Sequence, residues 1–215
     1  MPTGAIVERA RLAGLPIEEL TPTNAERRVV LQVPGGLHDA HRSLASRLAT
    51  SCRARVVIPE RELTAGAPFL TGIDDLLAVY RAMLRRGTPS EQIVVIGDAA
   101  GGDLAIAMLI RARELGLAMP RALVLLSPCM ADHPPSELAG LPAMLIQVGE
   151  RELGEIGRLF ERLQLAGLEF ELEAYANLRH AGQPFDAMPD AIEAIDRIAA
   201  FVDERFALPR LRAVG

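Results

Sequence analysis

Short, uninterrupted apolar segments alternate with longer amphipathic segments along most of the 215-residue chain. The apolar segments are rich in β-branched residues and predict strands at 29–33, 55–58, 93–96, 122–126, 144–148 and 169–175. The amphipathic segments predict helices at 40–50, 72–86, 101–115, 155–166 and 187–206. Continuous apolar runs are typical of parallel strands covered on both faces. The alternation therefore predicts an α/β fold with a doubly wound, mostly parallel six-stranded sheet flanked by helices.

One predicted strand differs from the others in its pattern. Residues 169–175 alternate glutamate with apolar side chains, which indicates an edge strand with one face in water. In a sheet of this kind, ligands bind at the carboxyl ends of the strands. We therefore expect functional residues in the loops that follow residues 33, 58, 96, 126, 148 and 175.

Charge and composition exclude several classes of function. The net charge is −5, the isoelectric point is near 5.5, and acidic and basic residues interleave, so we expect neither a nucleic-acid partner nor a membrane partner. No apolar run is long enough for a signal peptide or a membrane span. The two cysteines, Cys52 and Cys129, lie far apart in sequence and fit a reducing compartment, so we expect a cytoplasmic protein.

Residues 97–102 form the most informative turn. They read Gly-Asp-Ala-Ala-Gly-Gly, directly after a predicted strand and directly before a predicted helix. This is the setting of a nucleophile elbow, Gly-x-Ser-x-Gly. The central residue is Ala99, whose methyl group cannot attack a carbonyl or hold a covalent intermediate. A phosphate-binding role is disfavoured because Asp98 and Asp103 would repel phosphate, and we expect neither a cofactor nor a metal.

The order of motifs resembles the hormone-sensitive-lipase-like branch of the α/β-hydrolases, the bacterial carboxylesterases. The resemblance is strongest over residues 94–128, which hold the Gly-rich turn, an amphipathic helix and a strand ending in Leu-Ser-Pro. Residues 41–49, 141–149 and 175–180 also match segments of that family. The resemblance implies an α/β-hydrolase domain at 29–206, a residual N-terminal extension at 1–28 and a C-terminal tail at 207–215. The family's cap and opening β-hairpin are expected to be largely absent.

The resemblance also implies a set of site residues. Ala99 takes the nucleophile position and His180 the position of the general base. The acid that orients the histidine is Glu152 or Glu150. The remaining candidates are the oxyanion donors Gly35, Gly36 and Ala100, and the pocket residues Asp98, Leu37 and Cys129.

The sequence departs from the family pattern in more than the nucleophile. The oxyanion loop reads Pro34-Gly35-Gly36-Leu37, which lacks the family's leading histidine and is shortened, and the acid is displaced. One reading is a serine carboxylesterase represented as an inactive Ser-to-Ala variant at position 99. We favour a repurposed scaffold, because a single substitution does not account for the other departures.

A repurposed scaffold has two kinds of use. His180 would act as a base on a small hydrophobic or carbonyl-containing, ester-like molecule, without serine hydrolysis. Alternatively, the chain would bind a ligand or serve as the non-catalytic dimerisation partner of an active esterase, as a homodimer or heterodimer paired through residues 169–175.

Overall fold

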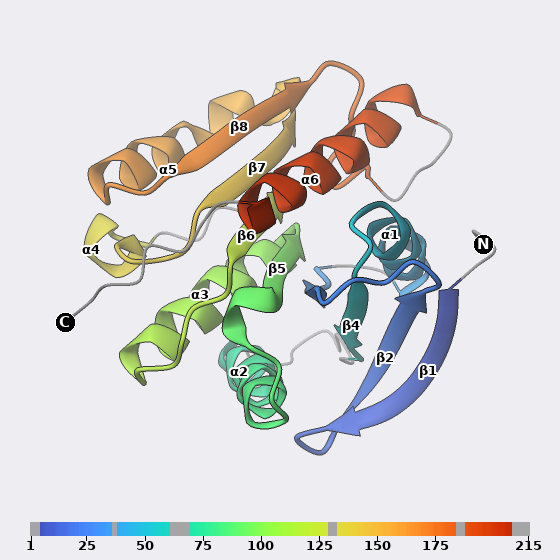
Figure 1. The fold of residues 1–215 in the computed structure, drawn as a ribbon. Coiled ribbons are helices and arrows are strands. Elements are labelled where there is room, and N and C mark those ends of the chain that lie inside the picture. The colour runs from blue at the N-terminus through green and yellow to red at the C-terminus, as the bar shows by residue number, and fades with distance from the viewer. Residues whose placement is uncertain (1–4, 36–37, 61–68, 129–132, 184–187, 208–215) are drawn as a thin grey trace.

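Eight strands form a single sheet in the order β1-β2-β4-β3-β5-β6-β7-β8 (Figure 1). The structure is a computed structural model and describes residues 5–35, 38–60, 69–128, 133–183 and 188–207. The strands are β1 Ala5–Leu12, β2 Leu15–Pro22, β3 Val29–Val33, β4 Arg55–Pro59, β5 Ile93–Asp98, β6 Ala122–Leu126, β7 Met144–Gly149 and β8 Phe170–Tyr175. The helices are α1 His38–Ser51, α2 Phe69–Arg85, α3 Ala100–Glu114, α4 Pro135–Leu138, α5 Leu153–Leu165 and α6 Pro189–Ala207, with short 3-10 helices η1 Ser90–Gln92 and η2 Glu150–Glu152.

The predicted architecture is confirmed, with one correction. Strands β3 to β8 pair in parallel, as the continuous apolar runs predict. The sheet has eight strands rather than six, because β1 and β2 add an antiparallel hairpin that pairs with β4. The opening hairpin expected to be largely absent is therefore present. Its turn residues, Ala13 and Gly14, both have positive φ, as a two-residue hairpin turn requires.

The hairpin escaped prediction because β1 lies at the edge of the sheet. Six of its eight positions are exposed, including Ile6 and Val7, so the strand has neither a buried run nor a buried alternation. The opposite edge is β8, which confirms the expectation of an edge strand at residues 169–175.

The core lies in two layers, one on each face of the sheet. On one face, α2, α3 and α5 pack side chains such as Tyr80, Leu109 and Leu159 against the sheet. On the other, α1 and α6 contribute Leu48 and Ile198. Successive strand residues alternate between the two layers, which explains why the central strands read as uninterrupted apolar runs.

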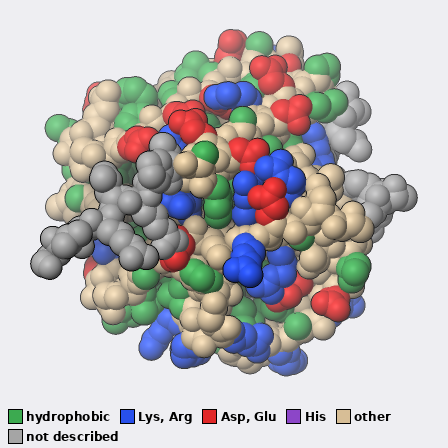
Figure 2. All heavy atoms as spheres, in the orientation of Figure 1, with side chains coloured by type: hydrophobic (Ala, Val, Ile, Leu, Met, Phe, Trp, Pro, Cys, Tyr) green, Lys and Arg blue, Asp and Glu red, His purple; other side chains and the backbone are tan. Residues whose placement is uncertain are grey.

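The surface carries both signs of charge. On the face in Figure 2, acidic and basic side chains are interspersed, in keeping with the sequence pattern. No helix in the described segments is both long and apolar enough to cross a membrane.

Candidate active site

The Gly-rich turn joins the carboxyl end of β5 to the first residue of α3. Ala99 occupies this turn with φ 47° and ψ −125°, a backbone conformation that residues other than glycine rarely adopt. Its amide donates to the Leu126 carbonyl at 2.9 Å, and its own carbonyl accepts from the Gly102 amide at 2.9 Å. The sharp strand-to-helix turn of a nucleophile elbow is therefore present at a residue without a hydroxyl.

Glycines allow the backbone to pack closely around this turn. A Cβ on Gly97 would lie 2.6 Å from the Gly101 carbonyl oxygen. A Cβ on Gly35 would lie 2.6 Å from the Gly101 amide nitrogen and 2.8 Å from that of Ala100. The close approach brings together Gly35 and Ala100, two of the predicted oxyanion donors. The Ala100 amide opens α3, where a helix leaves its first amides without intrahelical partners.

Asp98 is buried beneath the turn rather than exposed in a pocket. Its side chain is 8% exposed, and one carboxylate oxygen accepts from the Gly35 amide at 3.4 Å. The other lies 3.7 Å from Nδ1 of His41. Burial raises the pKa of Asp98, and the opposing effects of His41, the Gly35 amide and His180 do not cancel it. The hydrogen bond to Asp98 thus holds the backbone at Gly35 in place. The sequence analysis had instead predicted Asp98 as a pocket residue. Gly36 and Leu37 lie outside the described residues.

His180 and Glu152 form a hydrogen-bonded pair at the neighbouring strand ends. Nδ1 of His180 lies 2.5 Å from Oε1 of Glu152. Glu152 is in η2, directly after β7, and His180 is in the loop that follows β8. Gly149 makes their approach possible, because a Cβ at that position would overlap the Leu178 carbonyl oxygen. Glu150, the other predicted acid, faces a separate surface depression that it lines with Glu173 and Asp190.

Glu152 is held as a carboxylate with a fixed orientation. Its second oxygen, Oε2, accepts from the Ser127 hydroxyl at 2.7 Å and from the Gly149 amide at 2.8 Å. Burial by itself raises the pKa of Glu152, but the hydrogen bonds from His180, Ser127 and Gly149 outweigh it and lower the pKa. Among the described residues, the other ring nitrogen of His180, Nε2, makes no hydrogen bond. In an acid–base pair this is the nitrogen that exchanges a proton with the reactant.

Ser127 is a site residue that the sequence analysis did not identify. It follows β6, is 1% exposed, and has φ 45°. The Leu-Ser-Pro motif marked the end of a strand, but nothing in the motif itself indicated a bond between this hydroxyl and the acid. The strained backbone directs the hydroxyl toward Glu152 across the gap between two strand ends.

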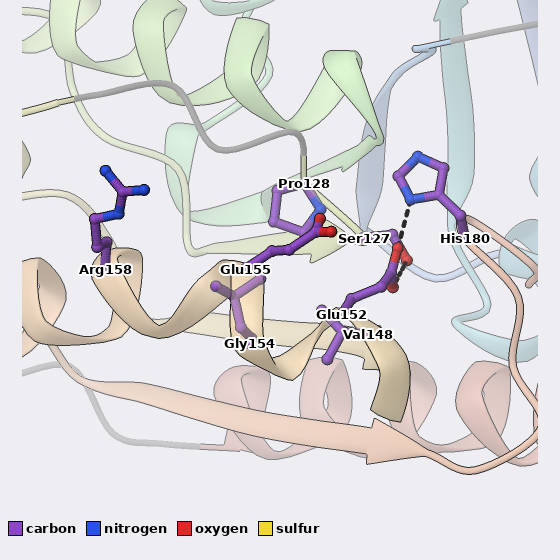
Figure 3. Close-up of a pocket in the computed structure, with 9 residues that line it drawn as sticks. Ser127, Pro128, Val148, Glu152, Gly154, Glu155, Arg158 and His180 are labelled. Carbon is purple, nitrogen blue, oxygen red and sulfur yellow. Dashed lines mark hydrogen bonds and ion pairs between the residues drawn. The ribbon is translucent and has the colours of Figure 1, made fainter.

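A pocket of about 540 Å³ opens beside the pair. His180, Glu152 and Ser127 line one end, and α5 lines the remainder with Gly154, Glu155 and Arg158 (Figure 3). Pro128, Val148 and Ile156 supply its apolar wall. None of the α5 residues was predicted. Cys129, the remaining predicted pocket residue, lies outside the described residues.

Comparison with known proteins agrees with this geometry. Residues 35–137 match a family model described as alpha/beta hydrolase fold. The chain is 26% identical to an esterase of Acinetobacter venetianus, over 89% of this chain and 80% of that protein. It is 28% identical to an acetyl-hydrolase of Streptomyces hygroscopicus, over 86% and 78%. The crystal structure of an esterase from the bacterial hormone-sensitive lipase family superimposes with a TM-score of 0.87 at 27% identity, covering 96% of this chain and 87% of that one.

Proposed function

Because the chain is an esterase-like α/β-hydrolase similar to hormone-sensitive-lipase-family esterases, we propose that its Glu152–His180 pair acts as a general base without a serine nucleophile. The substrate class is a small carbonyl or ester-like molecule bound beside Ala99. The observation that carries this proposal is the 2.5 Å hydrogen bond between His180 and a well-held carboxylate. The Ser127 hydroxyl that donates to this carboxylate directly follows Leu126, whose carbonyl accepts from the amide of Ala99.

The proposed reaction proceeds through water and forms no acyl-enzyme. His180 accepts a proton from water as the water oxygen bonds to the carbonyl carbon. The imidazolium is stabilised by Glu152, and it returns the proton to the departing alcohol as the carbon–oxygen bond breaks. In this proposal the intermediate oxyanion accepts from the amides of Gly35 and Ala100. The Gly35 amide, which donates to Asp98 in this structure, turns toward the oxyanion. The same base would remove a proton from carbon in a non-hydrolytic reaction.

Slow hydrolysis of p-nitrophenyl acetate tests this proposal. A positioned general base contributes about 10²-fold or more, so we expect the chain to exceed the buffer rate by about that factor, without a burst of p-nitrophenol and far below typical esterase turnover. His180→Ala should remove the excess, and Glu152→Gln should reduce it. A rate unaffected by His180→Ala, or equal to that of buffer, would reject general-base hydrolysis.

A second reading is that this is a serine carboxylesterase with alanine at position 99. The otherwise complete pairing of acid and base favours it, since Glu152 makes the contact expected of the family's acid despite the displacement in sequence. Under this reading Ala99→Ser should raise p-nitrophenyl acetate hydrolysis by at least about 10³-fold, with a burst phase. Adding His180→Ala to that variant should abolish the gain. If Ala99→Ser changes nothing, the site has diverged beyond its nucleophile, and the repurposed reading gains support.

A partner role is the third possibility. Strand β8 lies at the sheet edge and has one unpaired side, which is a surface suited to pairing with another chain. Sedimentation of the chain alone, and of the chain mixed with an active relative, distinguishes a homodimer from a heterodimer. A monomer in both experiments excludes pairing.

A further inference from the structure

The pocket beside His180 continues along one side of α5. Gly154, Glu155 and Arg158 line it in succession. Figure 3 shows the side chains of Glu155 and Arg158 standing on the same side of the helix, with His180 beyond its amino end. At 1.5 Å per residue, position 158 lies about 7 Å along the axis of α5 from its first residue, Leu153. The distance suits a ligand of a few carbon atoms between the reactive centre and the Arg158 end.

Arg158 is an exposed cation that lines the pocket together with His180. Within the described segments, it makes no hydrogen bond or ion pair. The same holds for exposed arginines such as Arg151 and Arg179, so what sets Arg158 apart from these is its place in the pocket. Glu155 also lines the pocket without a hydrogen-bond or ion-pair partner among the described residues. Its place in the first turn of α5 has an ordinary explanation, because the amino end of a helix favours negative charge. Arg158 lies in the second turn of α5, where the helix dipole gives no such explanation for a positive charge.

We propose that this pocket binds a short acyl or carbonyl compound that carries a carboxylate, with the carbonyl at His180 and the carboxylate at Arg158. The proposal rests on the proposed function for the position of the carbonyl, but its test is a binding measurement. The guanidinium is the side chain whose planar donors match a carboxylate. Glu155 stands between the two ends and repels a simple anion, so the two α5 side chains have opposite effects on affinity.

Binding of monomethyl glutarate and dimethyl glutarate by the chain as it stands tests this inference. The two probes share a length and differ in one carboxylate, and Ala99 precludes formation of an acyl-enzyme during the titration. We expect the monoester to bind about fivefold more tightly than the diester at low salt, with a smaller preference at high salt. Calorimetry or ligand-observed NMR gives both dissociation constants.

Three variants assign the effect to its residues. Arg158→Gln should abolish the preference for the monoester, and Glu155→Gln should increase it about twofold to fivefold. Arg151→Gln is the matched control, because Arg151 is an exposed arginine in η2 that does not line this pocket, and the preference should persist. Circular dichroism confirms that each variant is folded.

The contrary outcomes are distinct from failure of the proposed function. Equal binding of the two probes, binding of neither at millimolar concentration, or an unchanged preference in Arg158→Gln overturns the carboxylate site. A hydrolysis rate insensitive to His180→Ala would reject the proposed general-base function. A measured preference for the monoester would still stand, because it is a binding result.

Discussion

At the scale of single residues, the geometry of the turn does not depend on a nucleophile. Ala99 keeps a left-handed φ although it has no hydroxyl to present. Packing holds the strained conformation, because Gly97, Gly101 and Gly35 let three backbone segments meet without Cβ atoms between them. The turn therefore offers a ready position for a hydroxyl, which is why Ala99→Ser is an informative substitution.

Two glycine substitutions test that account with opposite expectations. Gly35→Ala places a Cβ 2.8 Å or less from backbone atoms of Asp98, Ala100 and Gly101, so the loop must shift. We expect a loss of about 2–3 kcal/mol in the free energy of unfolding. In Gly157→Ala, the added Cβ on α5 meets nothing within 4 Å, and alanine should add about 0.5–1 kcal/mol. Urea denaturation measures both. A neutral Gly35→Ala would show that the close packing around the turn is dispensable.

At the scale of elements, the sequence predicted nearly all of the sheet and its helices. Strands β3 and β6 match their predicted bounds, because both are uninterrupted buried apolar runs. The five long helices match within three residues at each end, because their burial is periodic. The hairpin was missed because β1 is an exposed edge strand without a buried pattern, and because glutamates and prolines interrupt the apolar residues of β2. The site was harder to predict, since its contacts join residues distant in sequence. His180 and Glu152 came from motif position, whereas Ser127, Glu155 and Arg158 became evident only once β6, β7 and α5 were placed side by side.

A buried amide pair links the elements that carry the acid and the base. Gln147 in β7 is fully buried, and its Nε2 donates to Glu173 at 2.9 Å and to the Ala194 carbonyl at 2.9 Å. Its carbonyl oxygen accepts from Nε2 of Gln183 at 3.5 Å. Gln183 is three residues beyond His180, so this network connects β7, β8 and α6 to the loop that bears the base.

Removing the amide of Gln147 should therefore be costly. Gln147→Leu leaves buried acceptors unsatisfied, and we expect the free energy of unfolding to fall by about 2–3 kcal/mol. Gln164→Leu, an exposed substitution on α5, should stay within about 0.5 kcal/mol of the parent chain. Equal stability of the two variants in urea denaturation would mean that the network does not stabilise this part of the fold.

At the scale of the whole molecule, one end of the sheet carries the candidate active site and the other carries contacts that stabilise the fold. The carboxyl ends of the strands hold the strained turn, the acid–base pair and the pocket. The amino ends of β3 and β4 are tied to the last turns of α6 through Asp203, which accepts from Arg28 and, at 2.8 Å, from Arg53. Arg28 also lies over the ring of Phe206, 4.8 Å from its centroid. These charged groups lie at the opposite end of the strands from the acid–base pair. They stabilise the fold by joining α6 to the starts of β3 and β4.

The Asp203 contacts make a pH-dependent contribution to stability whose sign is fixed. Burial by itself raises the pKa of Asp203, but the hydrogen bonds from Arg28 and Arg53 outweigh it and lower the pKa below its ordinary value. Because the pKa is lower in the folded state, Asp203 stabilises the fold at pH values above its unfolded-state pKa of about 3.9. This contribution is lost as the pH falls through the folded-state pKa. Asp203→Asn should therefore lower the free energy of unfolding by about 1 kcal/mol at pH 7, and the difference from the parent should shrink below about pH 4.

Asp196→Asn, an exposed change on the same helix, is the control and should have little effect at either pH. Urea denaturation at pH 7, 5 and 3.5 measures the three chains, and a pH-independent cost of Asp203→Asn would assign the effect to packing rather than to charge.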